Sequence, residues 1–207
     1  MSEPTRILLI RHGQSTWNAE GRWQGRANPP LSTLGEDQAR HASTRLAEVG
    51  PIDGIGSSTL QRAIQTSEFL AAGAEIALIG RFAGFDERSA GEWEGLTRAE
   101  IEEGYPGWLD ADRRPDGYET DASIEARGSA TLLELAVAHP GKRIAAVSHG
   151  GTIGTLERIG GDPWRRLANL EARWFEVTPD GFTPIGDRVH LLDDDDETNP
   201  PTPRGYA

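Results

Sequence analysis

Two histidines follow strand-like apolar runs in the same way. The run Ile7–Ile10 leads into Arg11-His12-Gly13, and the run Ile144–Val147 leads into Ser148-His149-Gly150. In open α/β sheets, ligands bind beyond the carboxyl ends of the strands, and a glycine there lets the backbone turn sharply and approach a ligand closely. Matching contexts for two of the five histidines favour one functional site over two separate structural histidines.

The chemistry that these residue types suit is phosphoryl transfer. An imidazole with an ordinary pKa of ~6.5 is mostly unprotonated at neutral pH, and attack by His12 on phosphorus would give a phosphohistidine. Because the transferring group carries charge on three oxygens, catalysis depends mainly on positioning and electrostatics. A planar guanidinium such as that of Arg11 can donate two parallel hydrogen bonds to phosphate oxygens, and His149 is expected to be a further donor.

The segments that must position these residues alternate between strand and helix patterns. The apolar periodicity predicts strands at 5–10, 52–57, 76–79, 143–148 and 171–178, the last alternating like an edge strand, and helices at 32–49, 60–72, 98–103, 123–138 and 151–159. This alternation predicts an α/β fold of three layers, α/β/α, with a mostly parallel central sheet. Residues 80–120 are rich in glycine, tryptophan and charge, and we expect an irregular excursion there.

Composition excludes several classes of protein. The 207 residues hold 21 Lys and Arg against 33 Asp and Glu, a formal charge of −12, which argues against nucleic-acid partners. The absence of cysteine excludes disulfides, a thiolate nucleophile and thiolate metal sites. The early apolar run is too short for a membrane segment, so we expect a cytoplasmic protein with no membrane partner. We expect a single domain at 1–192 and an acidic, proline-rich, flexible tail at 193–207.

Five ordered motifs carry a family resemblance. The first is RHGQSTWN, which begins at Arg11 and is followed by Gln24-Gly25 and LSTLGEDQA. The other four are Ser57–Ala63 (SSTLQRA), Phe85-Asp86-Glu87, Gly91–Leu96 (GEWEGL) and Val147–Gly151 (VSHGG). Together they resemble the histidine phosphatase superfamily, the phosphoglycerate-mutase-like proteins, over most of residues 5–160. One such motif alone would be weak support, whereas five in order are specific.

The resemblance implies roles for individual residues. Arg62 would be a second phosphate clamp beside Arg11, and Glu87 would give a proton to the leaving alkoxide and later take one from the attacking water. Asp86 is the lesser candidate for that acid. The residues expected to line the phosphate site are Asn18, Gln24, Gly25 and Gly150, the last through its backbone amide. No cofactor is implied.

Two competing interpretations of these residues are weaker. Two histidines and a carboxylate can form a metal site, but the guanidinium groups of Arg11 and Arg62 would repel a divalent cation and attract phosphate. A nucleotide-binding loop could be sought in Gly54–Thr59 (GIGSST), which lacks the third glycine of that motif. We therefore expect no metal.

Within the family, the sequence favours a phosphatase over a cofactor-dependent phosphoglycerate mutase. The mutases carry E-R-H-Y-G after the acid, whereas Glu87-Arg88 is followed here by Ser-Ala-Gly, and the stretch up to His149 is shorter. Residues 115–120 (PDGYET) resemble a motif of small broad-specificity phosphatases. The pair Arg113-Arg114, however, also occurs in mutases. The expected substrate is a small phosphorylated metabolite such as a sugar or glycerate phosphate. A non-catalytic phospho-ligand-binding relative is a second alternative. The sequence does not determine the oligomeric state, and a homodimer is one of the states considered.

Overall fold

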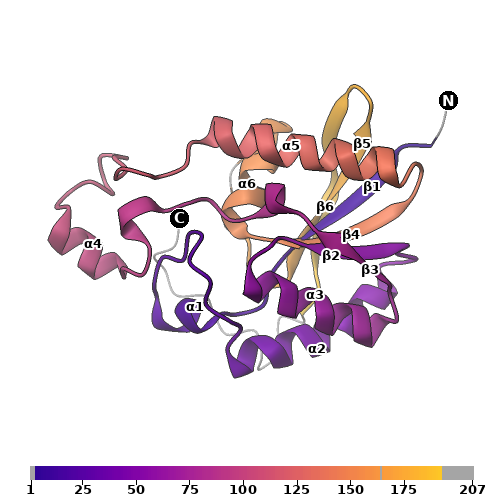
Figure 1. Cartoon of the computed structure of the whole chain (residues 1–207), viewed down its shortest axis with the longest axis horizontal. Helices are drawn as coiled ribbons and strands as arrows, with labels where there is room; N and C mark the ends of the chain where they lie inside the picture. Colours follow the sequence, from indigo (N-terminus) through magenta and orange to yellow (C-terminus); the bar gives the residue numbers. More distant parts are fainter. Residues whose placement is uncertain (1–2, 164, 193–207) are drawn as a thin grey trace.

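The computed structural model describes residues 3–163 and 165–192, in which strands and helices alternate (Figure 1). The predicted tail at 193–207 lies outside the described residues. The elements in chain order are β1 (Thr5–Arg11), α1 (Thr16–Glu20), α2 (Thr33–Glu48), β2 (Gly54–Ser57), α3 (Gln61–Ala74), β3 (Leu78–Arg81), the 3-10 turns η1 (Ala83–Phe85) and η2 (Gly91–Trp93), α4 (Arg98–Gly104), α5 (Asp121–Ala138), β4 (Arg143–Ser148), α6 (Gly150–Ile159), β5 (Glu171–Thr178) and β6 (Gly181–His190).

One six-stranded sheet, in the order β3-β2-β4-β1-β5-β6, forms the middle layer. The first four strands are parallel, β5 pairs antiparallel with β1, and β6 pairs antiparallel with β5. This confirms the predicted three-layer α/β fold with a mostly parallel sheet. The expectation that 171–178 is an edge strand is wrong, because β6 follows it and takes the edge position. Within the described residues, every helix is too short or too polar to cross a lipid bilayer.

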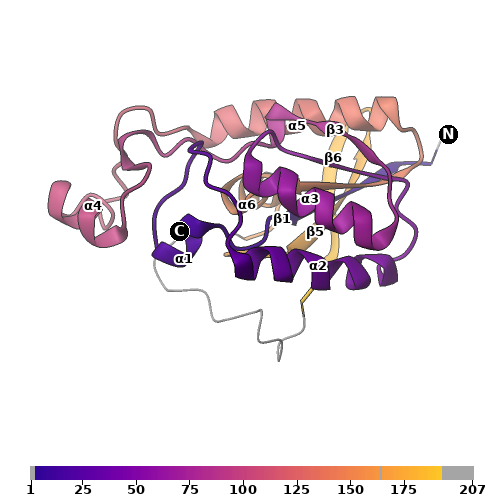
Figure 2. The same cartoon turned by 60° about the horizontal axis from the view of Figure 1, so that its bottom comes forward.

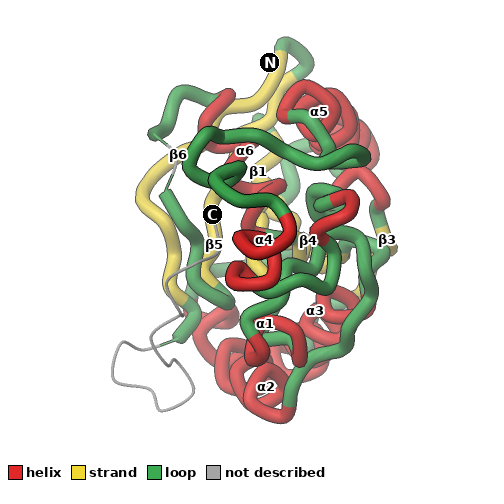
Figure 3. Tube along the Cα trace, turned by 90° about the vertical axis from the view of Figure 1, so that its left-hand side faces the viewer, coloured by secondary structure: helices red, strands yellow, loops and turns green. Residues whose placement is uncertain are grey.

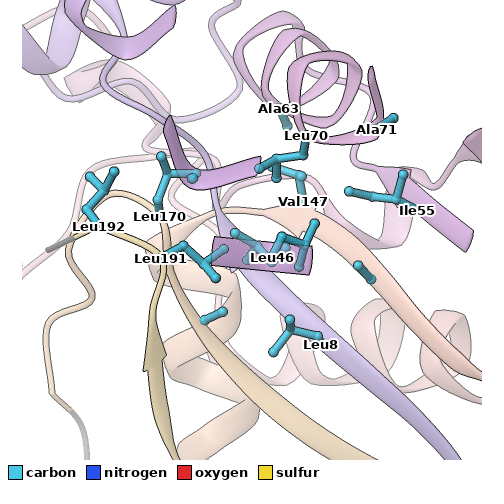
Figure 4. Packing of buried hydrophobic residues seen from close by; sticks show 14 residues of the cluster. Leu8, Leu46, Ile55, Ala63, Leu70, Ala71, Val147, Leu170, Leu191 and Leu192 are labelled. Carbon is cyan, nitrogen blue, oxygen red and sulfur yellow. The ribbon is translucent and has the colours of Figure 1, made fainter. Parts of the chain in front are cut away.

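Apolar side chains on both faces of the sheet hold the layers together. Leu8 and Ile10 of β1 pack in the cluster that includes α2 and α3, and Figure 4 shows Leu8 below Leu46 of α2 in this cluster. Ile7 and Leu9 point to the opposite face and join the cluster with α5 and α6. These four apolar side chains of β1 are fully buried, and the burial of each stabilises the fold by about 1.5–3 kcal/mol. A strand buried on both faces needs such a continuous apolar run.

The excursion between η2 and α5 lies beyond the sheet. Helix α4 projects from the end at which β1 terminates, on the same side as α1 (Figures 1 and 2), and it stands in front of the sheet when the molecule is viewed from that end (Figure 3). The excursion packs on a small apolar cluster that is separate from the two beside the sheet. This cluster is centred on Trp93 and Ile101 and also contains Trp23 from the loop after α1. The rings of Trp23 and Trp93 meet edge to face with centroids 5.4 Å apart.

The register of β1 and β4 brings the two histidine motifs together. Arg11 lies opposite Ser148 at the ends of the two parallel strands, and the backbone N–H of His12 donates to the carbonyl of Ser148 at 3.1 Å. His12 and His149 therefore leave the sheet at the same level. A common carboxyl end of adjacent parallel strands is the position at which such folds bind ligands.

Candidate active site

The imidazole of His12 is held in one orientation by hydrogen bonds on both ring nitrogens. Its Nδ1 lies 2.6 Å from the carbonyl oxygen of Gly13, and the Nε of Arg62 lies 3.2 Å from its Nε2. Because a carbonyl only accepts, Nδ1 carries the proton and Nε2 keeps its lone pair. The side chain of Asn169 donates to the His12 carbonyl at 2.8 Å and fixes the backbone.

The surroundings of His12 keep its ring neutral. Burial lowers the pKa of His12 well below its usual value, and the positive charges of Arg62 and then Arg11 lower it further. Burial disfavours the charged form of a histidine, and neighbouring cations act in the same direction. A neutral ring with a lone pair on Nε2 is the form of histidine that can act as a nucleophile.

Arg62 projects from the first turn of α3 and is fully buried. Its Nη1 donates to the carbonyl of Ala27 at 2.8 Å and its Nη2 to that of Gly25 at 3.0 Å, so the guanidinium braces the loop that follows α1. Burial lowers the pKa of Arg62 to about 10. At neutral pH the side chain therefore keeps its charge beside His12.

His149 stands beside His12, with ring centroids 5.0 Å apart. Its Nε2 lies 2.7 Å from the hydroxyl of Ser58, while its buried Nδ1 has no hydrogen-bond partner among the described residues. Burial lowers the pKa of His149 well below the usual value, and Arg62 and then His12 lower it further. Buried polar atoms are normally paired, so a ligand oxygen would satisfy the free ring nitrogen.

Arg11 and Gly150 lie together at the ends of β1 and β4. Arg11 is almost fully buried and donates through Nη1 to the carbonyl of Leu167. Gly150 begins α6, and a Cβ placed on it would lie 3.5 Å from the Nε of Arg11. The first turn of a helix presents backbone N–H groups and a positive dipole end, which suit an anion next to the Arg11 guanidinium.

Glu87 lies against the same helix start. Its Oε2 accepts the backbone N–H of Gly151 at 3.2 Å, and its Oε1 accepts those of Thr152 at 3.2 Å and Arg88 at 2.8 Å. The carboxylate of Asp86 instead accepts the backbone N–H and the hydroxyl of Thr59 at 2.8–2.9 Å. Of these two adjacent acids, Glu87 is therefore the one on the wall of the site.

The loop around α1 supplies the other predicted residues. Asn18 forms a capping box with Ser15, and the hydroxyl of Ser15 donates to the Oε1 of Gln24 at 2.6 Å. Gly25 has a φ of +51°, and a Cβ on it would lie 2.2 Å from the Oε1 of Glu94, so a larger residue would be strained there and would displace the Glu94 carboxylate. This packing fixes the loop close to Arg62.

A single cavity of about 680 Å³ joins these residues. Seven of the nine predicted site residues line it, namely Arg11, His12, Asn18, Gln24, Gly25, Glu87 and Gly150. The other two, Arg62 and His149, are not among the lining residues, but both lie next to His12, which is. The roles of all nine stay predictions. Among the described residues, no three His, Cys, Asp or Glu side chains gather as a candidate metal-ligand group.

The cavity has further polar residues beyond the nine predicted ones. Its wall includes Arg88, Arg158 and Arg166, together with Glu119 and Asp121. Arg88 follows the predicted acid and Glu119 lies in the motif at 115–120, although the sequence assigned neither side chain a role in the site. The sequence around the other three does not set them apart from residues on a solvated surface, and only the fold brings the five together.

The arginine pair of the excursion divides in two. Arg114 lies on the cavity wall, paired with Asp112 at 2.6 Å, whereas Arg113 stacks on the ring of Trp108 with its Cζ 4.2 Å from the centroid. Of the two arginines, only Arg114 is therefore among the residues that form the cavity.

The geometry agrees with comparisons to known proteins. The sequence profile of the histidine phosphatase superfamily, branch 1, matches residues 7–186. The chain belongs to the histidine phosphatase superfamily. It is 34% identical over 165 residues to a glucosyl-3-phosphoglycerate phosphatase of Mycobacterium tuberculosis, covering 73% of each chain. It is 33% identical over 159 residues to a metal-independent phosphoserine phosphatase of Arabidopsis thaliana, covering 73% of this chain and 67% of that one.

A solved histidine phosphatase structure also resembles the fold. The mycobacterial glucosyl-3-phosphoglycerate phosphatase in complex with VO3 superposes with a TM-score of 0.76 at 28% identity, covering 87% of this chain and 96% of that one. The predicted family is confirmed, and so is the predicted enzyme class, a phosphoric monoester hydrolase.

Proposed function

We propose that this histidine phosphatase hydrolyses small phosphomonoesters, without a metal, through a phosphohistidine on the Nε2 of His12. The observation that carries the proposal is the hydrogen bonding of His12, which leaves the lone pair on the nitrogen that faces Arg62. The second support is charge, because guanidinium groups of Arg11 and Arg62 stand within the same site as that nitrogen. Such a cationic site attracts a phosphate dianion.

In the first step, the Nε2 lone pair of His12 leaves the hydrogen bond from Arg62 and forms a bond to phosphorus, while the bond from phosphorus to the leaving oxygen breaks. Glu87 gives its proton to that oxygen, so an alcohol departs and Glu87 becomes a carboxylate. Arg11, Arg62 and His149 donate to the phosphoryl oxygens, on which the charge is spread. The loop residues Asn18, Gln24 and Gly25 and the amide of Gly150 complete the phosphate site.

In the second step, water attacks the phosphohistidine. Glu87 takes a proton from the water, the new oxygen bonds to phosphorus, and the bond from Nε2 to phosphorus breaks. Inorganic phosphate leaves, and both His12 and Glu87 return to their starting states. The two displacements replace one more difficult direct hydrolysis.

The proposal is tested by phosphate release from a panel of phosphomonoesters that includes phosphoserine, a sugar phosphate and both 2- and 3-phosphoglycerate, with EDTA present. We expect activity to persist with EDTA and an acid-labile phosphoenzyme to be trapped during turnover. His12→Ala should abolish both the adduct and the activity, whereas His41→Ala, which replaces an exposed histidine of α2, should retain them. Loss of activity with EDTA, or an adduct that persists in His12→Ala, would contradict the mechanism.

A phosphoglycerate mutase is the second candidate function, and the position of Arg114 on the cavity wall is the observation in its favour. The panel separates the two functions. Interconversion of the phosphoglycerates without release of inorganic phosphate would identify a mutase, and binding of phosphomonoesters without turnover would identify a non-catalytic relative. We further propose that residues 1–192 form one domain of a cytoplasmic enzyme.

A further inference from the structure

One arginine outside the predicted site holds the backbone that carries Glu87. Arg127, in the first half of α5, donates through Nη1 to the carbonyls of Gly84 at 2.8 Å and Asp86 at 2.6 Å. Its Nε and Nη2 donate to the two carboxylate oxygens of Glu119, each at 2.9 Å. A guanidinium is rigid and planar, so these four bonds fix the carbonyls relative to the carboxylate.

The carbonyl of Asp86 immediately precedes Glu87 and has a second donor. The hydroxyl of Thr152 in α6 reaches it at 2.7 Å, and the backbone N–H of the same residue donates to the Glu87 carboxylate. Thr152 thus touches both the backbone before Glu87 and its functional group. The position of the carboxyl relative to α6 therefore depends on where Arg127 and Thr152 hold the Asp86 carbonyl.

Glu119 extends the same support to the other side of Glu87. Its Oε2 accepts the backbone N–H of Ser89 at 3.3 Å, and its own N–H donates to the carbonyl of Ser89 at 3.0 Å. Its Oε1 also accepts Nη2 of Arg26 at 3.1 Å. Arg26 follows Gly25 in the loop after α1, which we call the phosphate loop because the proposed function places the phosphate against it. The side chain of Glu119 is only 8% exposed, so it is held by protein donors rather than by water.

We propose that Arg127 and Glu119 are positioning residues for Glu87. Together they hold the chain on both sides of it, at Asp86 and at Ser89, and tie that segment to the phosphate loop through Arg26. The inference rests on the proposed function, in which Glu87 moves the proton. A buried ion pair by itself contributes little net stability. The specific consequence is placement of an acid relative to the leaving oxygen, and small displacements of a catalytic group slow the step that uses it.

The test compares two substrates that differ in their need for the acid. Alkyl phosphates release a strongly basic alkoxide that requires a proton, whereas 4-nitrophenyl phosphate releases a phenoxide that does not. We expect Arg127→Gln to slow release of the alcohol from an alkyl phosphate in a single turnover by about 10- to 100-fold. Release of nitrophenol and the inhibition constant of inorganic phosphate should change by less than about threefold. Thr152→Val, which removes the second bond to Asp86 with little change of shape, should give a smaller loss of the same kind.

Two controls separate positioning from folding. Arg173→Gln removes another buried arginine, paired with Glu157 and Asp162, none of which lines the cavity. It should lower the Tm without distinguishing the substrates. The double variant Glu87→Gln/Arg127→Gln should be no slower on the alkyl phosphate than Glu87→Gln alone. Equal losses on both substrates in Arg127→Gln and Thr152→Val, or additive losses in the double variant, would overturn the inference. If the wild type then still forms a His12-dependent phosphoenzyme, the proposed function stands without it.

Discussion

Two neutral histidines in the core of the site should make the fold sensitive to mild acid. The pKa values of His12 and His149 are lowered well below the usual value by burial and by Arg62. In the unfolded chain the same residues titrate near ~6.5. Above that pH neither state binds the proton, so the shift costs no stability. Below it the unfolded state gains protons that the fold excludes, and the free energy of unfolding falls as the pH falls.

The size of the expected loss in the free energy of unfolding follows from proton binding to the two histidines in the unfolded chain. At about pH 5.5, one unit below the unfolded pKa, a histidine that stays neutral in the fold costs about 1.4 kcal/mol relative to pH 8. His12 and His149 together cost about 2.8 kcal/mol over this interval. Carboxyl groups titrate mostly at lower pH, and their effect cancels between variants that share them.

Urea unfolding of the wild type and of His12→Asn at these two pH values measures the effect. Between pH 8 and 5.5, the free energy of unfolding of His12→Asn should fall by about 1.4 kcal/mol less than that of the wild type. His149→Asn should show the same difference from the wild type. His41→Asn, which removes a histidine exposed on α2, is the control for the substitution itself. An identical loss in wild type and His12→Asn would refute the reasoning, because His12 would then protonate as readily in the fold as in the unfolded chain.

Three further changes test the packing of the site and of the sheet. Arg62→Lys keeps a charge but loses the planar fork, and should lower kcat/KM for phosphomonoesters by on the order of 10²–10³, measured by phosphate release, whereas an unchanged value would exclude a clamp. Gly35→Ala should destabilise the fold by about 2–3 kcal/mol in urea, because its Cβ would lie 1.9 Å from the Gln14 carbonyl. The matched control Gly104→Ala, with open space around it, should cost nothing. Leu8→Ala should lower the free energy of unfolding by about 2–5 kcal/mol and leave kcat of the folded enzyme unchanged; a comparable loss of kcat would show that sheet packing and site geometry are coupled.

The sequence was sufficient to predict where the histidines meet. Apolar runs before His12 and His149 specify strands buried on both faces, and adjacent parallel strands must end at one edge of the sheet. Arg62 joins them because it lies in the first turn of the helix after β2, a position that the motif indicates and the hydrogen bond to His12 explains.

Other features leave no local trace in the sequence. Strand β6 contains Pro184 and Gly186 and has few buried side chains, so its pattern lacks the alternation by which strands are recognised. Arg127 has the appearance of any charged residue on a helix. Its hydrogen bonds join Gly84 and Asp86 of one segment to Glu119 of another, far along the chain. Such contacts are properties of the assembled fold.

Trp23 belongs to two parts of the molecule at once. It lines the cavity next to Gln24 and Gly25, and its ring also packs edge to face on Trp93 in the small cluster that contains Ile101 of α4. If the excursion were replaced by that of a relative in order to change specificity, the residue that packs on Trp23 would change with it, and the indole would lose its matched partner. Such an exchange should therefore succeed only when Trp23 and Trp93 are replaced together. In evolution, a substitution at either position restricts the substitutions that the other position tolerates.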